Sequence, residues 1–343
     1  MKKKLLLGLL AAAAVSFTAC QKDEVISEMP QDNAIGFGTY VGRDAQTKAD
    51  VTNIGTMENA DYAGFGVFAY YTGTTDYTDG QTSFAPSFMN NVRVYYQSGW
   101  KYDNKKYWPN STEKISFFAY APHVATADAI ITGFSNETTK ADPTINFTTP
   151  TDVEDQIDLL YANNKNQTQT DGTVEFTFNH ALSRIGFKVK TERTDYRVTI
   201  SKITLTGDFN TSGTLNLCTG TWSGEDTEAN QDTYELTFNT ANNINSTSGT
   251  AIEATEGYVM AIPTTFEESS KLNVSVNYTY QYEVSTGVWS TATSDTKNGS
   301  IATTFAKGNA YTLVMTLDPL QPIEFTVTSV EGWSPEDGTN VAI

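Results

Sequence analysis

The sequence predicts an all-β protein built from β-sandwiches. Apolar and polar residues alternate with a period of two along segments such as 272–280 and 323–327, which is typical of strands with one buried face. Turn signals such as Asp79-Gly80 separate these segments, as expected between short strands. No segment has a convincing helical period, and residues 151–160 predict at most a short helical turn.

The N-terminus predicts a secreted lipoprotein. Lysines at positions 2–4 precede an apolar run over residues 5–15, which is too short to span a bilayer and is typical of a signal-peptide core. Residues 16–20, SFTAC, then resemble a bacterial lipobox. We therefore expect residues 1–19 to be removed and Cys20 to carry the lipid. An ordinary secretory signal with an incidental cysteine is the alternative.

The residues after the lipobox predict a surface address. Residues 21–24, QKDE, resemble the surface-export signal of lipoproteins in one Gram-negative phylum, and residues 20–33 are expected to form a polar tether. The chain has a formal net charge of −18, so we expect no nucleic-acid partner. It has two cysteines. If Cys20 is lipidated, Cys218 is alone and no intrachain disulfide can form.

The length of 343 residues suits about two domains. The polar stretch 163–170 has no apolar residue and precedes a turn signal, so we place the boundary there. The prediction is an N-terminal β-sandwich over residues 34–168 and a C-terminal β-sandwich over residues 169–343. Both are of ordinary sandwich size.

Catalytic signatures are missing from the sequence. It has two histidines, His123 and His180, no Gly-x-Ser-x-Gly elbow, and no Cys or His spacing that suits zinc. We therefore expect no enzyme, no metal and no cofactor, although an acid pair of the glycosidase kind could arise through folding. Aromatic residues crowd the segment 95–108. They either fill a sandwich core or form a sugar platform, so a surface carbohydrate-binding lipoprotein is the alternative function.

Short phrases spread over nearly the whole mature chain resemble those of one family. In chain order they are IGF at 35–37, TKA at 47–49, FGVFAY at 65–70, YWP at 107–109, ISFFAYAP at 115–122, DLLYA at 158–162, FNHALSRI at 178–185, KGNAY at 307–311 and VEGW at 330–333. In this order and behind a lipobox, they resemble the fimbrillin family, the Mfa-like subunits of type V pili. The resemblance implies two transthyretin-like β-sandwich domains in tandem, an outer membrane lipoprotein precursor, and assembly with other fimbrial subunits into adhesive surface fimbriae.

For stalk members of the family, the resemblance implies polymerisation by donor-strand exchange. An arginine-directed protease cuts after the first strand, and a C-terminal segment of the next subunit fills the groove that opens. Here residues 35–41 alternate as a removable first strand would, Arg43 follows directly, and the next arginine is Arg93. The expected cut is therefore between Arg43 and Asp44. A surface arginine in a loop is the alternative.

The C-terminal segment has the pattern expected of a donor strand. Pro322 precedes an alternating run in which Ile323, Phe325 and Val327 are the apolar members, and the tail to Ile343 could extend the insertion. The alternative is that this strand completes its own domain. The resemblance therefore predicts a polymerising stalk subunit, with a non-polymerising tip or anchor subunit as the alternative.

Overall fold

The computed structural model describes residues 33–41, 54–226, 232–239 and 243–331. In these residues the regular structure is nearly all strand, beside one short helix α1 (Ile54–Met57) and two 3-10 turns, η1 (Val153–Asp155) and η2 (Gln169–Asp171). The all-β prediction is confirmed, and η1 lies within the stretch predicted to hold a helical turn. None of the helices in the described ranges has the length and apolar character that a membrane crossing requires.

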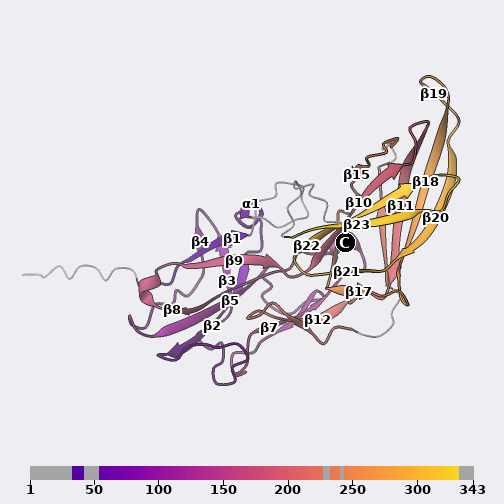
Figure 1. Ribbon diagram of the computed structural model, residues 1–343. Helices are drawn as coiled ribbons and strands as arrows, with labels where there is room; N and C mark the ends of the chain where they lie inside the picture. The colour runs from indigo at the N-terminus through magenta and orange to yellow at the C-terminus, as the bar shows by residue number, and fades with distance from the viewer. Residues whose placement is uncertain (1–32, 42–53, 227–231, 240–242, 332–343) are drawn as a thin grey trace, which may run out of the picture.

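The N-terminal lobe is centred on a seven-stranded sheet (Figure 1). Its strands, in spatial order, are β1 (Phe37–Val41), β9 (Val174–His180), β8 (Leu160–Gln167), β5 (Lys114–Ala121), β2 (Phe65–Gly73), β3 (Met89–Tyr96) and β4 (Trp100–Lys101). The central strands β2 and β5 are apolar on both faces, and both faces are buried. β1 is an edge strand, and it pairs with β9 in parallel.

Each face of this sheet has its own hydrophobic core. On one face Phe68 and Phe118 pack with Ile145 and Leu215, which belong to a four-stranded sheet. That sheet consists of β13 (Trp222–Ser223), β12 (Ser212–Asn216), β7 (Thr144–Thr148) and β6 (Ile131–Phe134). On the other face Phe117 packs with residues of β1 and β9. The alternation of side chains along β5 therefore divides neighbouring phenylalanines between two cores.

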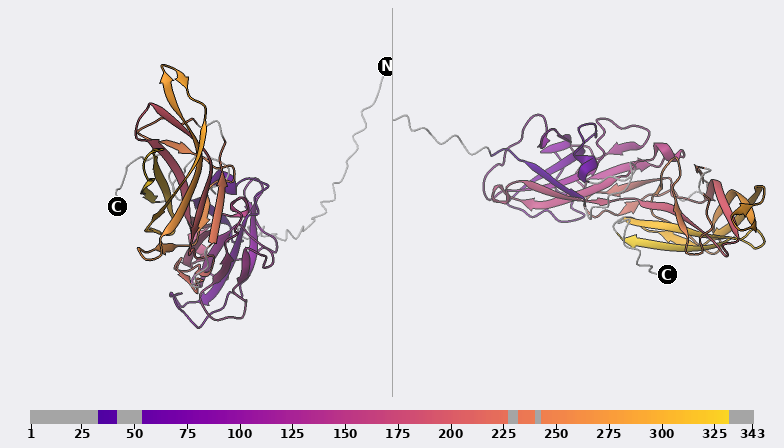
Figure 2. Two further views of the ribbon diagram at one scale, coloured as in Figure 1. Left: turned by 90° about the vertical axis from the view of Figure 1, so that its right-hand side faces the viewer. Right: turned by 90° about the horizontal axis from the view of Figure 1, so that it is seen from above.

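The C-terminal lobe is a second sandwich with its own core (Figure 2). One sheet contains β15 (Thr250–Ile252), β10 (Ser183–Thr191), β22 (Asn309–Leu317) and β23 (Glu324–Glu331), with β16 (Val259–Ala261) also paired to β10. The other contains β14 (Asp232–Thr237), β11 (Tyr196–Gly207), β18 (Leu272–Ser285), β19 (Val288–Trp289) and β20 (Thr293–Ile301). A small pair, β17 (Thr264–Phe266) and β21 (Thr303–Phe305), lies beside them.

The polar stretch 163–170 is not the unstructured connection that its composition predicted. β8 runs through it to Gln167 and pairs with β5. Its asparagines bind the backbone of neighbouring segments: the Asn163 amide donates to the carbonyl of Cys218 at 3.0 Å, and Asn166 accepts from the amide of Tyr77 at 2.7 Å. Polar side chains that are satisfied in this way are compatible with a strand inside a sheet.

Sheets also cross the predicted boundary between residues 168 and 169. β9 belongs to the seven-stranded sheet, and β12 pairs with β7. The chain therefore stays in the N-terminal lobe through β9 and returns to it with β12 after β10 and β11, and the strand pairing does not divide at residue 168.

Candidate functional site: the two terminal strands

The first strand is inserted into the N-terminal lobe and held on both sides. On one side the Val174 amide of β9 donates to the Gly36 carbonyl at 2.9 Å. On the other side the Ile35 amide donates to the Lys106 carbonyl at 2.9 Å, and the Trp108 amide donates to the Asn33 carbonyl at 3.0 Å. The strand thus lies in a slot between β9 and the segment 106–108.

The slot is lined by aromatic rings that surround Phe37. The Phe37 ring stacks on Phe176 at a centroid distance of 5.8 Å, and it meets Tyr102, Phe117 and Phe65 edge-on at 5.4, 5.9 and 6.3 Å. We call these four rings the aromatic cage. Aromatic pairs of this geometry contribute about 0.5–1.5 kcal/mol each beyond area burial. The cage therefore fixes the position of the Phe37 ring.

The faces of the first strand alternate as the sequence predicts. Ile35 and Phe37 are 2% and 7% exposed, whereas Tyr40 is 51% exposed. Thr39 has its hydroxyl oxygen buried without a hydrogen-bond partner. The expected cleavage residues Arg43 and Asp44, and the expected lipidation site Cys20, lie outside the described residues.

At the other end of the chain, β23 is also an edge strand. It pairs with β22 in antiparallel register, from Asn309 opposite Glu331 to Thr316 opposite Glu324. Ile323 is buried, and Phe325 and Val327 are partly buried against the core of the C-terminal sandwich. In the single chain this segment therefore completes its own domain, which is the arrangement that the sequence left as the alternative. A donor role requires β23 to leave this position.

Two features fix how β23 sits in its own lobe. A Cβ added to Gly299 of β20 would lie 2.4 Å from the Phe325 ring and 2.9 Å from Ile323, so the glycine makes room for both side chains. The Lys297 ammonium donates to the carbonyls of Pro319 and Gln321 at 3.2 and 2.9 Å. It thereby ties the loop that precedes β23 to β20.

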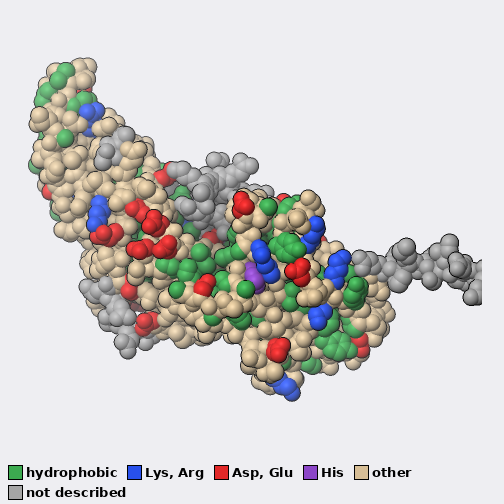
Figure 3. Space-filling model, turned by 180° about the vertical axis from the view of Figure 1, so that it is seen from behind, with side chains coloured by type: hydrophobic (Ala, Val, Ile, Leu, Met, Phe, Trp, Pro, Cys, Tyr) green, Lys and Arg blue, Asp and Glu red, His purple; other side chains and the backbone are tan. Residues whose placement is uncertain are grey.

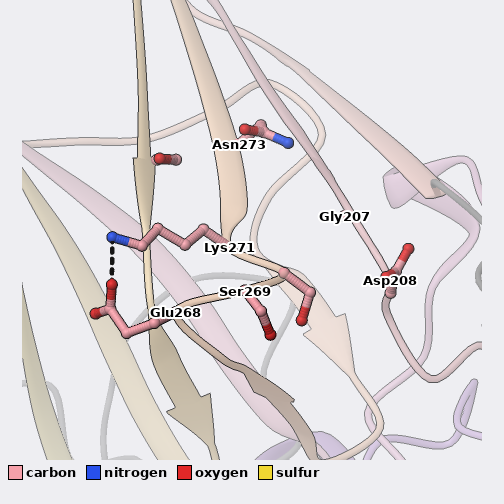
Figure 4. Close-up of a pocket in the computed structure, with 8 residues that line it drawn as sticks. Gly207, Asp208, Glu268, Ser269, Lys271 and Asn273 are labelled. Atoms are coloured by element: carbon pink, nitrogen blue, oxygen red, sulfur yellow. Dashed lines mark ion pairs between the residues drawn. The ribbon is translucent and has the colours of Figure 1, made fainter.

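The other polar clusters have little catalytic potential. A cavity of about 440 Å³ is lined by Asp208, Lys271 and other polar residues. The Lys271 ammonium is paired with the Glu268 carboxylate at 2.6 Å (Figure 4). His180 is buried against Asp158 at 2.9 Å, and burial lowers the pKa of His123. Among the described residues, no group of three or more His, Cys, Asp or Glu side chains is placed to hold a metal ion.

Part of the aromatic crowd of segment 95–108 belongs to the core. Trp108 is buried, while Trp100 and Tyr102 pack against the same core as Phe37. Tyr107 is exposed, and Tyr95 and Tyr96 are partly exposed and belong to none of the three core clusters. Acidic side chains gather over the C-terminal lobe in the view of Figure 3, whereas lysine and arginine side chains lie mostly over the N-terminal lobe, interspersed with acidic and apolar ones. This face has no continuous basic surface for a polyanion.

Sequence reasoning missed the aromatic cage around Phe37. The notable phrase IGF at 35–37 identified the inserted strand, but the cage comes from β2, β5, β9 and the loop after β4. The parallel pairing of β1 with β9 brings Thr39 opposite Phe176 across 137 positions of sequence. The alternating phenylalanines of β9 were the available signal, since they predict a buried face.

Comparisons with known proteins agree on one family. A family model described as fimbrillin-like matches residues 47–333. Fimbrium subunit Fim1C of Phocaeicola vulgatus is 27% identical, with 98% of each chain covered. A fimbrial protein of Bacteroides vulgatus has a similar crystal structure, with a TM-score of 0.69, 26% identity, and coverage of 88% of this chain and 99% of that one.

A more distant structure supports the fold alone. A putative cell adhesion protein of Bacteroides ovatus has a TM-score of 0.52 at 16% identity, and the match covers 89% of this chain and 99% of that one. The family match includes most of the described strands and confirms the resemblance found in the sequence. The family is one of structural fimbrial subunits and is not known as an enzyme family. By the extent of the family match and the agreement of the fold, the chain belongs to the fimbrillin-like family, of Mfa-like type.

Proposed function

We propose that this chain is a polymerising structural subunit of cell-surface fimbriae that assembles by donor-strand exchange and supports adhesion. It is made as an outer membrane lipoprotein anchored through Cys20, and it is built as two transthyretin-like sandwiches in tandem. An arginine-directed protease cuts between Arg43 and Asp44, and the partners are further copies of the chain and other fimbrial subunits.

One observation carries the proposal: each terminal strand lies at a sheet edge with its apolar side chains in a core. β1 pairs with β9 and also bonds to the segment 106–108, whereas β23 pairs with β22. Either strand can leave from its edge without separating the other paired strands of its sheet. A cut at Arg43 would detach residues up to 43 from the rest of the chain. The slot would then need a new occupant.

The empty slot would be costly to leave open. Burying one large apolar side chain contributes about 1.5–3 kcal/mol, so loss of Ile35 and Phe37 would forfeit roughly 3–6 kcal/mol on the same basis. The unpaired edge of β9 and the amide of Trp108 would also need partners. A strand with matching apolar residues from another molecule supplies both, which is the physical basis of strand addition.

The experiment compares the full-length chain with Arg43→Lys, which keeps the positive charge but is not a substrate for an arginine-specific protease. We expect the protease to give a new N-terminus at Asp44 and fibres visible by electron microscopy. Arg43→Lys should remain uncut and monomeric. Normal fibres from Arg43→Lys, or a cut chain that stays monomeric at high concentration, would contradict the proposal.

A further inference from the structure

The strand that leaves and the strand proposed to enter have the same side-chain pattern. Residues 35–39 read IGFGT, and residues 323–327 read IEFTV. Each has isoleucine, then phenylalanine two residues on, then a β-branched residue two further on. Because side chains alternate along a strand, these three positions share one face in both segments.

We propose that β23 of a neighbouring copy replaces β1 in one fixed register, parallel to β9, with Ile323 in the place of Ile35, Phe325 in the aromatic cage and Val327 in the place of Thr39. This inference rests on the proposed function. It goes further by assigning the direction, the register and the residues that select the donor. The expected neighbours across the new pair are Phe325 with Val174, Thr326 with Glu175, and Val327 with Phe176, by substitution into the register of β1.

The third inward-facing position, held by Thr39 in β1 and by Val327 in β23, favours replacement of β1 by β23. Thr39 has a buried hydroxyl oxygen with no hydrogen-bond partner. A buried polar atom without a partner is destabilising, and valine has nearly the same shape as threonine with a methyl group in place of the hydroxyl. Val327 therefore fills this position without the unpartnered oxygen, so the entering strand fits the slot better than the resident one.

The second inward-facing position, held by Phe37 in β1 and by Phe325 in β23, also favours replacement of β1 by β23. Phe325 is only partly buried in its own lobe, whereas Phe37 is 7% exposed inside the cage. Moving a phenylalanine from an edge to the cage buries more of its ring and adds four aromatic neighbours. A shift of one residue would turn the apolar side chains outward. A shift of two residues would put Ile323 or Val327, which have no ring, into the cage.

The outward positions can accept the larger donor residues. A Cβ at Gly36 would meet nothing closer than the Thr173 hydroxyl at 3.5 Å, which leaves room for Glu324. A Cβ at Gly38 would lie 2.1 Å from a carboxylate oxygen of Glu175. The Glu175 side chain is exposed and clashes only through its flexible end, so it can rotate to admit Thr326.

Cysteine pairs test the register directly. Glu175→Cys is combined with Thr326→Cys in the full chain, and the matched controls combine it with Glu324→Cys or Thr328→Cys. Fibres are assembled under reducing conditions, then oxidised mildly and separated without reductant. We expect a ladder of covalent multimers with the Thr326→Cys pair, at least tenfold stronger than with either control. The wild-type chain, which keeps Cys218, gives the background.

Each outcome is decisive. A stronger ladder with Glu324→Cys or Thr328→Cys would overturn the register while leaving strand exchange in place. Fibres without a ladder in any variant would mean that another segment, such as the tail to Ile343, fills the slot, and would also overturn the inference. Failure of the protease-treated wild-type chain to form fibres would refute the proposed function itself.

Discussion

Replacing Thr39 by valine should stabilise the first strand in its slot. The Thr39 hydroxyl oxygen is buried and has no hydrogen-bond partner, and leaving a buried polar group unsatisfied costs about 1–3 kcal/mol. Valine keeps the branched shape and removes that oxygen. We therefore expect Thr39→Val to raise the free energy of opening this strand by about 1–2 kcal/mol, which corresponds to roughly a five- to thirtyfold change in the opening equilibrium.

Native-state hydrogen exchange measures this change at a single bond. The Val174 amide donates to the Gly36 carbonyl, so it exchanges when the first strand opens. In Thr39→Val, hydrogen exchange at the Val174 amide should slow by roughly five- to thirtyfold. In the control Thr177→Val, which changes an exposed threonine on β9, it should stay within about twofold, as for a surface substitution.

The same substitution should delay assembly. A more stable resident strand leaves the slot less often after proteolysis, so Thr39→Val fibres should appear later than wild-type fibres at equal protein concentration. Unchanged or faster exchange at Val174 in Thr39→Val would refute the reasoning, because it would mean that the Thr39 hydroxyl is satisfied in solution.

Three further predictions concern the cage, the loop before β23 and the buried thiol. Phe37→Ala empties the aromatic cage and should lower the free energy of unfolding by about 3–5 kcal/mol in denaturant titrations. The control Tyr40→Ala, which changes an exposed side chain, should lower it by less than about 1 kcal/mol. Equal losses of stability in the two variants would show that the cage is not tightly packed. Lys297→Met removes both hydrogen bonds to the loop before β23, so the amides that pair β23 with β22 should exchange about fivefold faster, for a loss near 1 kcal/mol. Lys271→Met, which breaks an exposed ion pair on another loop, should leave those amides unchanged, and an equal effect would contradict the role of Lys297. Burial raises the pKa of the Cys218 thiol to about 12, which keeps the thiol protonated at pH 8. Alkylation of Cys218 in the folded chain should therefore be on the order of a thousandfold slower than alkylation of a free thiol, and unfolding should restore the fast rate. Rapid labelling of the folded chain would contradict this prediction.

Local patterns predicted the strands and the inward-facing residues. Alternation alone placed Ile35 and Phe37 on a buried face, and the same rule placed Ile323 with Phe325. These predictions depend on the period of two, which is a property of a few neighbouring residues. The resemblance to fimbrillins, which depends on short contiguous phrases, was confirmed by the family match over residues 47–333.

Long-range pairing was not predictable in the same way. Nothing near residue 37 indicates that β1 pairs with β9 in parallel, or that Tyr102 and Phe176 both contact the Phe37 ring. The polar stretch 163–170 was wrongly taken as unstructured because its asparagines bind the backbone near Tyr77 and Cys218. Such partners come together only through the fold, so composition could not reveal them.

A high-resolution structure of the assembled fibre tests the central claim most directly. The decisive feature is the strand that lies beside β9, between Phe176 and Tyr102. We predict that this strand belongs to the neighbouring molecule, runs parallel to β9 and places Phe325 in the cage. A fibre in which each molecule keeps its own Phe37 there, with β23 still paired to its own β22, would contradict it.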